Sequence, residues 1–256
     1  MTFPVLQDKV IIVTGSAQGM GAATARLAAA AGAKVILADW NDAGSQAMVD
    51  DIKADNGNAT FVKTDVSDPA SVENMVNHAV ETYGRIDGAV NNAAIKPDTS
   101  PLSELDVEYF DRLISVNLKG VALCLKFELR QLIKQGGGGS IVNISSTSAL
   151  RPQYNQSPYT AAKHGVVGLT KNAALENGAH NIRVNSVAPG AIETQMLTET
   201  LAENKLNPED VAAALSVLNR FCTPEEVAEG SIWLLSDNSS YVTGSVLYID
   251  GGYTGR

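Results

Sequence analysis

Short runs of apolar and β-branched residues alternate with longer segments of helical periodicity along most of the chain. Such short runs are typical of buried parallel strands, and the longer segments are typical of packed helices. Strands that alternate with helices indicate a parallel sheet with right-handed crossovers. The predicted strands cover residues 9–14, 34–38, 59–63, 86–90, 139–144 and 181–187, with a last one in 246–252, and the predicted helices cover 22–31, 43–55, 69–83, 105–135 and a segment from Pro158 onward.

The unusual polar motifs of the chain each follow the carboxyl end of a predicted strand. In a doubly wound sheet these ends form the edge where ligands bind. We therefore predict an α/β fold with a single Rossmann-type doubly wound parallel sheet of about seven strands, with helices on both faces and a ligand site at one edge. The motif residues at that edge are Gly15, Asp39, Asp65, Asn91, Ser146 and Gly190.

The first predicted strand runs directly into a glycine-rich loop, and an alanine-rich helix follows. This order of elements points the amides of a helix N-terminus at a phosphate. Glycines let a pyrophosphate approach the backbone, so we expect Gly15, Gln18, Gly19, Met20 and Gly21 to bind a dinucleotide. The spacing G-x-x-x-G-x-G differs from the commoner G-x-G-x-x-G, and it lacks the Gly-Lys-Ser/Thr end of a Walker A loop. A flexible turn is the alternative interpretation.

Asp39 lies at the carboxyl end of the second predicted strand, 18 residues after Gly21. A carboxylate there can accept both ribose hydroxyls of adenosine and would repel a 2'-phosphate. No Arg or Lys in the glycine loop or directly after Asp39 would neutralise such a phosphate. We therefore expect NAD rather than NADP, with Trp40 also at the cofactor. The alternative is that Asp39 only caps the turn of residues 39–42.

Tyr159 and Lys163 are four residues apart in a predicted helix, so their side chains share one face. An ammonium near a phenol favours the phenolate, and we expect the pKa of Tyr159 to fall from about 10 toward neutrality. Such a phenol can accept or donate a proton near physiological pH. Among seven tyrosines, Tyr159 alone has a lysine four residues on. The alternative is a surface tyrosine and a solvated lysine.

Composition narrows the class of protein. With 256 residues, 45% of them hydrophobic and 18% charged, the chain suits one large globular domain, which we place at residues 1–256. A net charge of -9 argues against nucleic acid as a partner. The two cysteines and three histidines show no metal-ligand spacing. Since neither a signal-peptide pattern nor a bilayer-length apolar run is visible, we expect a soluble, cytoplasmic protein with no membrane partner.

Together these motifs resemble the short-chain dehydrogenase/reductase family. The resemblance extends from Lys9 to near Gly252, with the motifs in the family's order and at compatible spacing. Ser146 rather than Ser145 matches the family's catalytic serine, because it lies 13 residues before the tyrosine. One departure is Ala94, where the family more often has glycine. The matching residues are Thr14-Gly15-x-x-x-Gly19-x-Gly21, Asp65-Val66, Asn91-Asn92-Ala93, Asn117, Ser146, Tyr159-x-x-x-Lys163 and Pro189-Gly190 with Thr194.

The resemblance implies a role for each matching residue. Tyr159 would be the general acid/base at the substrate oxygen, and Lys163 would lower its pKa and hold the nicotinamide ribose. Ser146 would hydrogen-bond the substrate oxygen. Asn117, within the long predicted helix, would hold a water that links Lys163 to solvent. Further cofactor contacts would come from Asp65 and Val66 at the adenine, from Asn91, and from Pro189, Gly190, Ile192 and Thr194 around the nicotinamide.

Structural roles are the alternatives for three of these residues. Asn117 would point at solvent or bond back to its own helix. Ser146 would be a turn residue at a strand end, and Thr194 would be the N-cap of the following helix.

The implied reaction is reversible hydride transfer between an alcohol carbon and the nicotinamide of NAD(H), without a metal. The substrate would bind Ser146 and Tyr159, between residues 147–157 and a mobile lid at 191–221. These segments favour a small or cyclic secondary alcohol, a diol or a sugar-like polyol. The resemblance also implies a homotetramer. The alternatives are an NADPH-dependent ketoacyl-type reductase and a non-catalytic NAD-binding protein.

Overall fold

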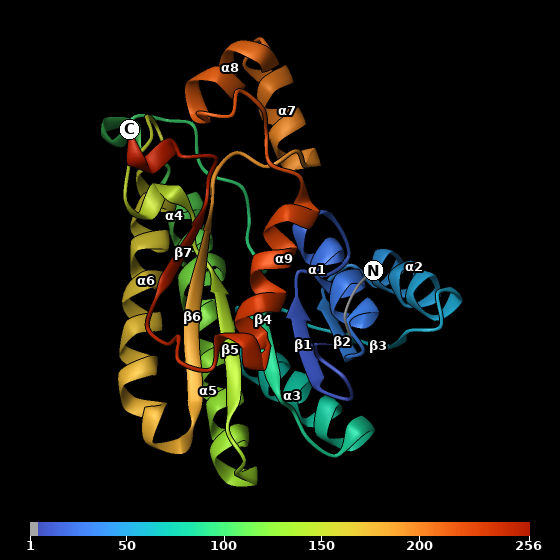
Figure 1. Ribbon diagram of the computed structural model, residues 1–256. Coiled ribbons are helices and arrows are strands. Elements are labelled where there is room, and N and C mark those ends of the chain that lie inside the picture. Colours follow the sequence, from blue (N-terminus) through green and yellow to red (C-terminus); the bar gives the residue numbers. More distant parts are fainter. Residues whose placement is uncertain (1–4) are drawn as a thin grey trace.

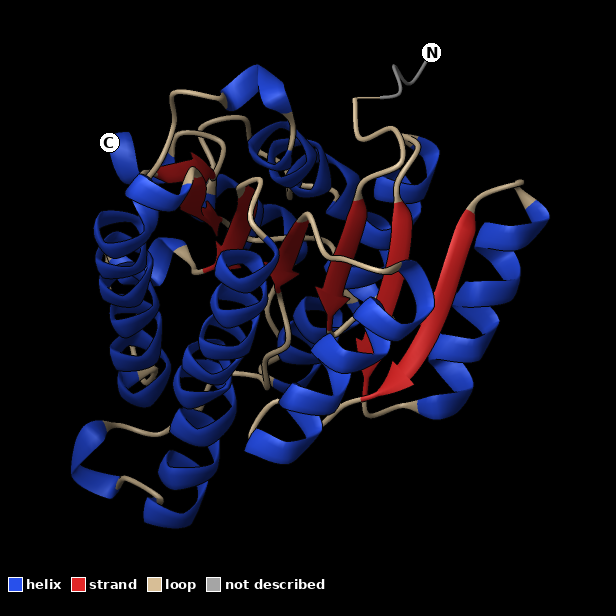
Figure 2. Ribbon diagram, turned by 90° about the horizontal axis from the view of Figure 1, so that it is seen from below, coloured by secondary structure: helices blue, strands red, loops and turns tan. Residues whose placement is uncertain are grey.

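A computed structural model describes residues 5–256, so the first four residues of the predicted domain lie outside the described residues. Within the described range, seven parallel strands form one sheet in the order β3-β2-β1-β4-β5-β6-β7, with helices on both faces (Figure 1, Figure 2). The predicted fold class is therefore confirmed. The strands are β1 (Val10–Thr14), β2 (Lys34–Asp39), β3 (Asn58–Lys63), β4 (Gly88–Asn91), β5 (Gly139–Ile144), β6 (Ile182–Pro189) and β7 (Val246–Ile249).

The two faces of the sheet are covered by different helices. Ile11 and Val13 of β1 belong to the core under α1, α2 and α9, whereas Val10 and Ile12 belong to the core under α3, α5 and α6. This alternation follows from the two-residue period of a strand, and it makes residues 10–13 of β1 apolar on both faces. The helices are α1 (Gly19–Ala30), α2 (Asp42–Ala54), α3 (Pro69–Tyr83), α4 (Val107–Ile114), α5 (Gly120–Gln135), α6 (Ser157–Asn177), α7 (Gln195–Glu203), α8 (Pro208–Leu215) and α9 (Pro224–Leu235). No helix within residues 5–256 is both long and apolar enough to cross a bilayer.

Helix α1 begins at Gly19, earlier than the predicted start at Ala22. The φ angles of Gly15 and Gly19 are 65° and 56°, in the left-handed region that glycine adopts without strain. The loop therefore turns at once after β1. As a result Gly21, which we expected in the loop, lies in the first turn of the helix.

The single helix predicted over residues 105–135 contains a π-helical turn. The π-helix Ser115–Lys119 joins α4 to α5. Asp106 caps the N-terminus of α4 by accepting a hydrogen bond from the Tyr109 amide. Hydrophobic periodicity does not reveal a one-turn widening of this kind, and such turns are frequent at functional sites. This one carries Asn117.

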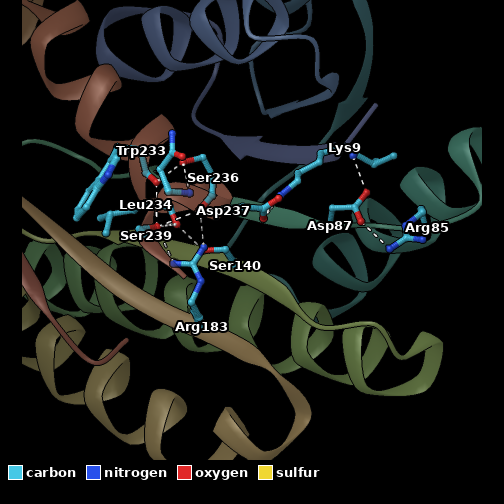
Figure 3. A network of polar contacts seen from close by, with 12 residues as sticks. Lys9, Arg85, Asp87, Ser140, Arg183, Trp233, Leu234, Ser236, Asp237 and Ser239 are labelled. Carbon is cyan, nitrogen blue, oxygen red and sulfur yellow. Dashed lines mark hydrogen bonds and ion pairs between the residues drawn. The ribbon is translucent and has the colours of Figure 1, made fainter. Parts of the chain in front are cut away.

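Polar side chains bind the amino ends of the strands together, at the edge opposite the glycine loop (Figure 3). The Arg183 guanidinium, at the start of β6, donates to Ser239 Oγ at 2.9 Å and to Ser236 O at 3.0 Å. Asp87, just before β4, accepts the Val10 N–H at 2.8 Å. The Arg183 contacts join β6 to the segment after α9, and the Asp87 contact joins β4 to β1, so together they hold the edge that lies away from the motif residues.

Helices α7 and α8 project beyond the carboxyl edge of the sheet and lie in the segment predicted as a lid (Figure 1). The two ends of this segment meet at its base. The Cys222 amide donates to Ala191 O at 2.9 Å, and the Glu193 amide donates to Cys222 O at 2.8 Å. The intervening residues therefore form a closed loop on a hydrogen-bonded base.

Candidate functional site

The parallel strands bring the motif residues to one edge of the sheet. Gly15 follows β1, Asp39 and Asn91 end β2 and β4, and Ser146 and Gly190 follow β5 and β6. The strand order reverses between β1 and β4, which is the position where doubly wound sheets open a crevice for a ligand. We treat this crevice as the candidate active site.

The glycine loop packs tightly against the end of β4. A methyl group on Gly21 would lie 2.0 Å from Gly15 O, and one on Gly15 would lie 2.8 Å from the Ala93 Cα. Asn92 donates from Nδ2 to Thr14 O at 2.9 Å and to Gly15 O at 3.1 Å. The loop is therefore held in one shape that leaves no room for side chains at Gly15 and Gly21.

The first turn of α1 is open to an anion. Gln18 and Gly19 are exposed, Met20 is half-buried, and the Gln18 side chain makes no capping hydrogen bond within the described residues. A methyl group on Gly19 would lie 3.7 Å from the Thr194 Cγ2, so the start of the lid faces this turn. Because uncapped N-terminal amides carry the positive end of the helix dipole, the turn suits a phosphate.

Asp39 holds the glycine loop through its two carboxylate oxygens. Oδ2 accepts the Ala17 N–H at 3.0 Å, and Oδ1 accepts the Asn41 N–H at 2.9 Å. The second contact is the turn role that we considered as an alternative, whereas the tie to Ala17 was not predicted. A carboxylate oxygen can accept more than one hydrogen bond, so ribose hydroxyls can still donate to Asp39. Trp40, which follows it, is 76% exposed at the same edge.

Asp65 and Val66 follow β3 and differ in their surroundings. Asp65 is exposed, and its Oδ1 accepts hydrogen bonds from the Ser67 amide at 2.9 Å and the Ser67 hydroxyl at 2.7 Å. Val66 is buried against Gly120, where a methyl group would lie 2.9 Å from the Val66 Cγ2. Val66 also borders a small hollow that lies between several elements at this edge. The hollow is lined by Thr14, Val66, Asn91, Ala93, Gly120, Val121 and Cys124.

The Asn91 side chain faces the interior of the protein. Its Nδ2 donates to Asn143 Oδ1 at 2.9 Å and to Glu128 Oε2 at 3.0 Å, and the residue is 2% exposed. Only the Asn91 backbone is therefore placed to contact a cofactor. Sequence reasoning missed Glu128, although a signal was present: it lies on the buried apolar face of α5, four residues from Cys124 and Leu132.

Tyr159 and Lys163 lie on the same face of α6. The Lys163 Nζ is 5.5 Å from the centre of the Tyr159 ring, and it donates a hydrogen bond to Ile144 O at 2.9 Å. Lys163 is 2% exposed, whereas Tyr159 is partly exposed. The alternative of a surface tyrosine beside a solvated lysine therefore does not hold for this pair.

The expected fall in the pKa of Tyr159 does not occur in the protein chain by itself. Burial raises the pKa of Tyr159 above its ordinary value, and interaction with the Ser146 hydroxyl opposes that rise. Burial also lowers the pKa of Lys163 to about 8. The prediction was wrong because it counted the attraction between ammonium and phenolate but not the loss of solvation of both groups.

The two neighbouring serines after β5 have different roles. Ser145 is buried, and its hydroxyl donates to Val187 O at 3.1 Å and accepts from the Ser186 hydroxyl at 2.8 Å. Ser146 is partly exposed, faces Tyr159, and accepts the Ser148 amide at 3.1 Å. The Ser146 hydroxyl can still donate to a further partner, whereas the Ser145 hydroxyl already donates to Val187 O.

Asn117 is fully buried and binds the backbone of the segment after β4. Its Oδ1 accepts the Ile95 N–H at 2.8 Å, and its Nδ2 donates to Ile95 O at 3.0 Å. It neither faces solvent nor bonds back to its own helix, the alternatives that we considered. These two contacts position the segment that forms one wall of the crevice.

The segment predicted as a lid starts at the edge that holds the candidate site. Pro189 ends β6, and a methyl group on Gly190 would lie 2.9 Å from the Asp250 Cα. Ile192 forms a parallel bridge with Cys222 at the base of the lid. Thr194 caps α7 by accepting the Leu197 N–H at 3.4 Å, which is the structural role that we considered for it. A salt bridge that the sequence did not suggest, Lys96 to Glu203 at 3.2 Å, connects the wall after β4 to α7.

Comparison with known proteins gives consistent results. Residues 15–254 match the family described as Enoyl-(Acyl carrier protein) reductase. A short chain dehydrogenase/reductase of Aspergillus oryzae is 49% identical over 248 residues, which cover 96% of this chain and 95% of that protein. The 2,5-dichloro-2,5-cyclohexadiene-1,4-diol dehydrogenase of Sphingobium indicum is 40% identical over 249 residues, which cover 97% of this chain and 98% of that one. The crystal structure of levodione reductase matches with a TM-score of 0.91 and 39% identity, covering 98% of this chain and 99% of that chain.

Similarity at this level over nearly the whole chain requires a common family, and the strand order and the serine–tyrosine–lysine cluster fit the same conclusion. This protein belongs to the short-chain dehydrogenase/reductase family of oxidoreductases.

Proposed function

We propose that the protein is an NAD(H)-dependent dehydrogenase that interconverts a small or cyclic secondary alcohol and its ketone. The observation that carries this proposal is the cluster at the crevice: the Lys163 Nζ 5.5 Å from the Tyr159 ring, with the Ser146 hydroxyl facing the tyrosine. Together these residues supply a proton-transfer group, a cation and a hydrogen-bond donor around one substrate oxygen.

In alcohol oxidation, the Tyr159 phenolate accepts the hydroxyl proton while Ser146 donates a hydrogen bond to the same oxygen. Lys163, which is anchored on Ile144 O, stabilises the phenolate by its charge. Asn117 positions the wall after β4 through Ile95. NAD⁺, when bound, supplies the hydride acceptor at C4 of its nicotinamide.

The residues of the edge fit a dinucleotide. The uncapped first turn of α1 would hold the pyrophosphate, and no side chain projects from Gly15, Gly19 or Gly21 to block it. Lys163 would also hold the nicotinamide ribose. The remaining contacts would come from Gln18, Met20, Trp40, Asp65, Val66, the Asn91 backbone, Pro189, Gly190, Ile192 and Thr194.

We favour NAD over NADP because Asp39 presents a carboxylate where the adenosine ribose would lie. Lys63 is the register partner of Asp39 in the sheet, but its Nζ binds Asp42 Oδ2 at 3.0 Å. The Asp42 carboxylate therefore offsets the charge that could otherwise attract a 2'-phosphate. Kd values for NADH and NADPH test this preference, and tighter binding of NADPH would contradict it.

A cyclic substrate is supported by the relative from Sphingobium indicum, whose name specifies a cyclohexadiene diol. We propose residues 191–221 as the lid over such a substrate, with Ser146 and Tyr159 as the residues that hold its oxygen. Initial rates of NADH formation with cyclohexanols, cyclic diols and open-chain polyols would show which class of substrate the enzyme prefers.

The Tyr159→Phe variant tests the function itself. It keeps the ring but removes the proton-transfer group, so kcat/KM should fall by about 10²- to 10⁴-fold while NADH binding is retained. Tyr241→Phe is the matched control, because Tyr241 is fully exposed. Activity of Tyr159→Phe equal to that of the control would exclude the proposed mechanism.

A reductase of carrier-bound acyl groups is the second candidate, because a 3-oxoacyl-[acyl-carrier-protein] reductase of Thermotoga maritima is 42% identical over 247 residues, which cover 96% of this chain and 98% of that protein. Assays with a 3-oxoacyl thioester and NADPH, beside a cyclic alcohol and NAD⁺, distinguish the two. The proposal requires the cyclic alcohol with NAD⁺ to have a higher kcat/KM than the 3-oxoacyl thioester with NADPH.

We also propose a homotetramer, which is supported by large apolar side chains on the surface of the chain. Leu175 of α6 is 83% exposed, Trp233 of α9 is 41% exposed and Tyr248 of β7 is 36% exposed. Contact with further copies would remove them from water. Light scattering should give four times the mass of the chain, and Leu175→Glu should give a smaller species.

A further inference from the structure

Glu128 is a fully buried carboxyl group that the proposed reaction does not use. It lies on α5 and contacts the end of β4, where Asn91 Nδ2 donates to its Oε2 at 3.0 Å. The same Asn91 amide donates to Asn143 of β5, and Asn143 donates to the Thr170 hydroxyl of α6 at 3.0 Å. These four side chains connect two helices and two strands beneath the crevice.

Two oxygen atoms of this cluster have no hydrogen-bond partner within the described residues: Asn91 Oδ1 and Glu128 Oε1. Both are buried, and they belong to the two side chains that already share one hydrogen bond. As a carboxylate, Glu128 has only acceptors, so it could not satisfy the Asn91 oxygen. A proton on Oε1 would supply the donor that the pair needs.

We propose that Glu128 is a neutral carboxylic acid in the folded protein, and that its Oε1–H donates to Asn91 Oδ1. The acid and the carboxamide then form a reciprocal pair, with one hydrogen bond in each direction. Glu128 is thus a positioning residue for Asn91. The next residue, Asn92, donates to Thr14 O and Gly15 O, so the pair fixes the chain one residue before the contact that holds the glycine loop.

Among residues 5–256, no charged group of the neighbouring elements shifts the pKa of Glu128. Lys163 of α6 is bound to Ile144 O, and His78 of α3 contacts the Thr60 hydroxyl at 3.4 Å. The ionisable group beside Glu128 is Cys124, one turn earlier on α5, and its thiol pKa is raised by burial and by the nearness of Glu128. Burial likewise raises the pKa of Glu128 to about 7, against the opposing hydrogen bond from Asn91.

The pair should make folding sensitive to pH in a defined range. The folded pKa of Glu128 lies above the unfolded value, so its contribution to stability is full below pH about 4.5 and is lost as the pH rises toward and through about 7. The loss corresponds to a decrease of roughly 10²-fold in the folding equilibrium constant. Glu128→Gln carries its own N–H donor and should not show this loss.

The test compares denaturant unfolding of the full chain at pH 5 and pH 8 for the wild type, Glu128→Gln and Glu81→Gln. Glu81 is exposed on α3 and serves as the matched control. Between pH 5 and pH 8, the proposal expects the folding constant of the wild type and of Glu81→Gln to fall by about 10²-fold more than that of Glu128→Gln. An equal pH dependence in all three proteins would overturn it.

Infrared spectroscopy of the wild type tests the proton directly, and it does not depend on whether the variant folds. With ¹³C-labelled glutamate, a carboxylic-acid carbonyl band that shifts with the label should be present at pH 6 and lost above pH 8. This result requires no cofactor or substrate, so it is independent of the proposed function. Absence of the band at pH 6 would show that Glu128 is ionised and would refute the pair.

Discussion

The Lys163 ammonium lies 5.5 Å from the centre of the Tyr159 ring, one helical turn along α6. Lys163→Met keeps the length and apolar stem of the side chain but removes the charge. The phenolate of Tyr159 then loses its cation, so we expect kcat/KM for alcohol oxidation to fall by about 10²- to 10⁴-fold. The pH at which oxidation reaches half of its maximum should also move upward, because the pKa of Tyr159 rises without the cation.

The Lys163→Met variant should lose activity without losing stability, because burying the lysine ammonium carries a desolvation penalty in the wild type. The pKa of Lys163 is lowered to about 8 from an ordinary value of 10.5. The folded wild type therefore binds fewer protons than the unfolded chain between these values, and it should gain about 3 kcal/mol relative to Lys163→Met as the pH rises from 8 to 10.5. Denaturant unfolding across this range measures the difference. If Lys163→Met unfolds far more easily than the wild type at pH 7, the lysine has a structural role instead.

Replacement of Asp39 should weaken cofactor binding more than it changes the preference between NADH and NADPH. Asp39→Asn has a single acceptor oxygen, so one of the Ala17 and Asn41 amides loses its partner. We expect a loss of about 1–3 kcal/mol in stability and weaker binding of NADH, with little gain in NADPH binding. Asp50→Asn is the matched control, because Asp50 is exposed on α2 and its carboxylate accepts a hydrogen bond from the nearby Gln46 side chain. Binding titrations with both cofactors decide the point, and a clean switch to NADPH in Asp39→Asn would contradict it.

Asn117→Ala should destabilise the wall of the crevice. The Ile95 N–H and C=O would both lose their partners, at a cost of about 1–3 kcal/mol in stability. Activity should fall as well, since Asp98 of this wall contacts the backbone of Tyr159, the proposed proton-transfer residue. Asn172→Ala is the control, because Asn172 is exposed on α6 and its side chain donates to the nearby Glu176. Thermal unfolding and kcat/KM of the two variants should differ clearly, and equal behaviour would count against the role of Asn117.

Arg183→Met should separate stability from function, because Arg183 lies at the edge opposite the crevice. Its loss leaves Ser236 O and Ser239 Oγ without the guanidinium, and we expect a decrease of about 1–3 kcal/mol in the free energy of unfolding. The kcat/KM of the remaining folded enzyme should stay at the wild-type value. Arg26→Met removes an exposed ion pair with Asp51 and should cost less than about 1 kcal/mol.

The sheet and the edge that holds the site were predictable because they depend on local patterns. Strand-length apolar runs alternate with helices, and parallel strands must place the residues after them, such as Gly15 and Ser146, at one edge. The choice of Ser146 over Ser145 followed from spacing, and the structure adds that Ser145 is already hydrogen-bonded to Val187 O.

The features that were missed arise from contacts between distant segments or from burial. The contact of Asp39 with Ala17 joins residues 22 positions apart, and that of Asn117 with Ile95 also spans 22 positions. Neither has a signature in the neighbouring sequence. The pKa of Tyr159 depends on how much solvent the fold removes, which a helical spacing of four residues does not reveal.

The π-turn at Ser115–Lys119 gives the joint between α4 and α5 one residue more than a regular helix would hold. Deleting one residue there would narrow the joint to a regular α-helix. Asn117 would then no longer occupy the widened turn from which it binds the Ile95 backbone. This helix therefore tolerates exchange of side chains better than any change in its length.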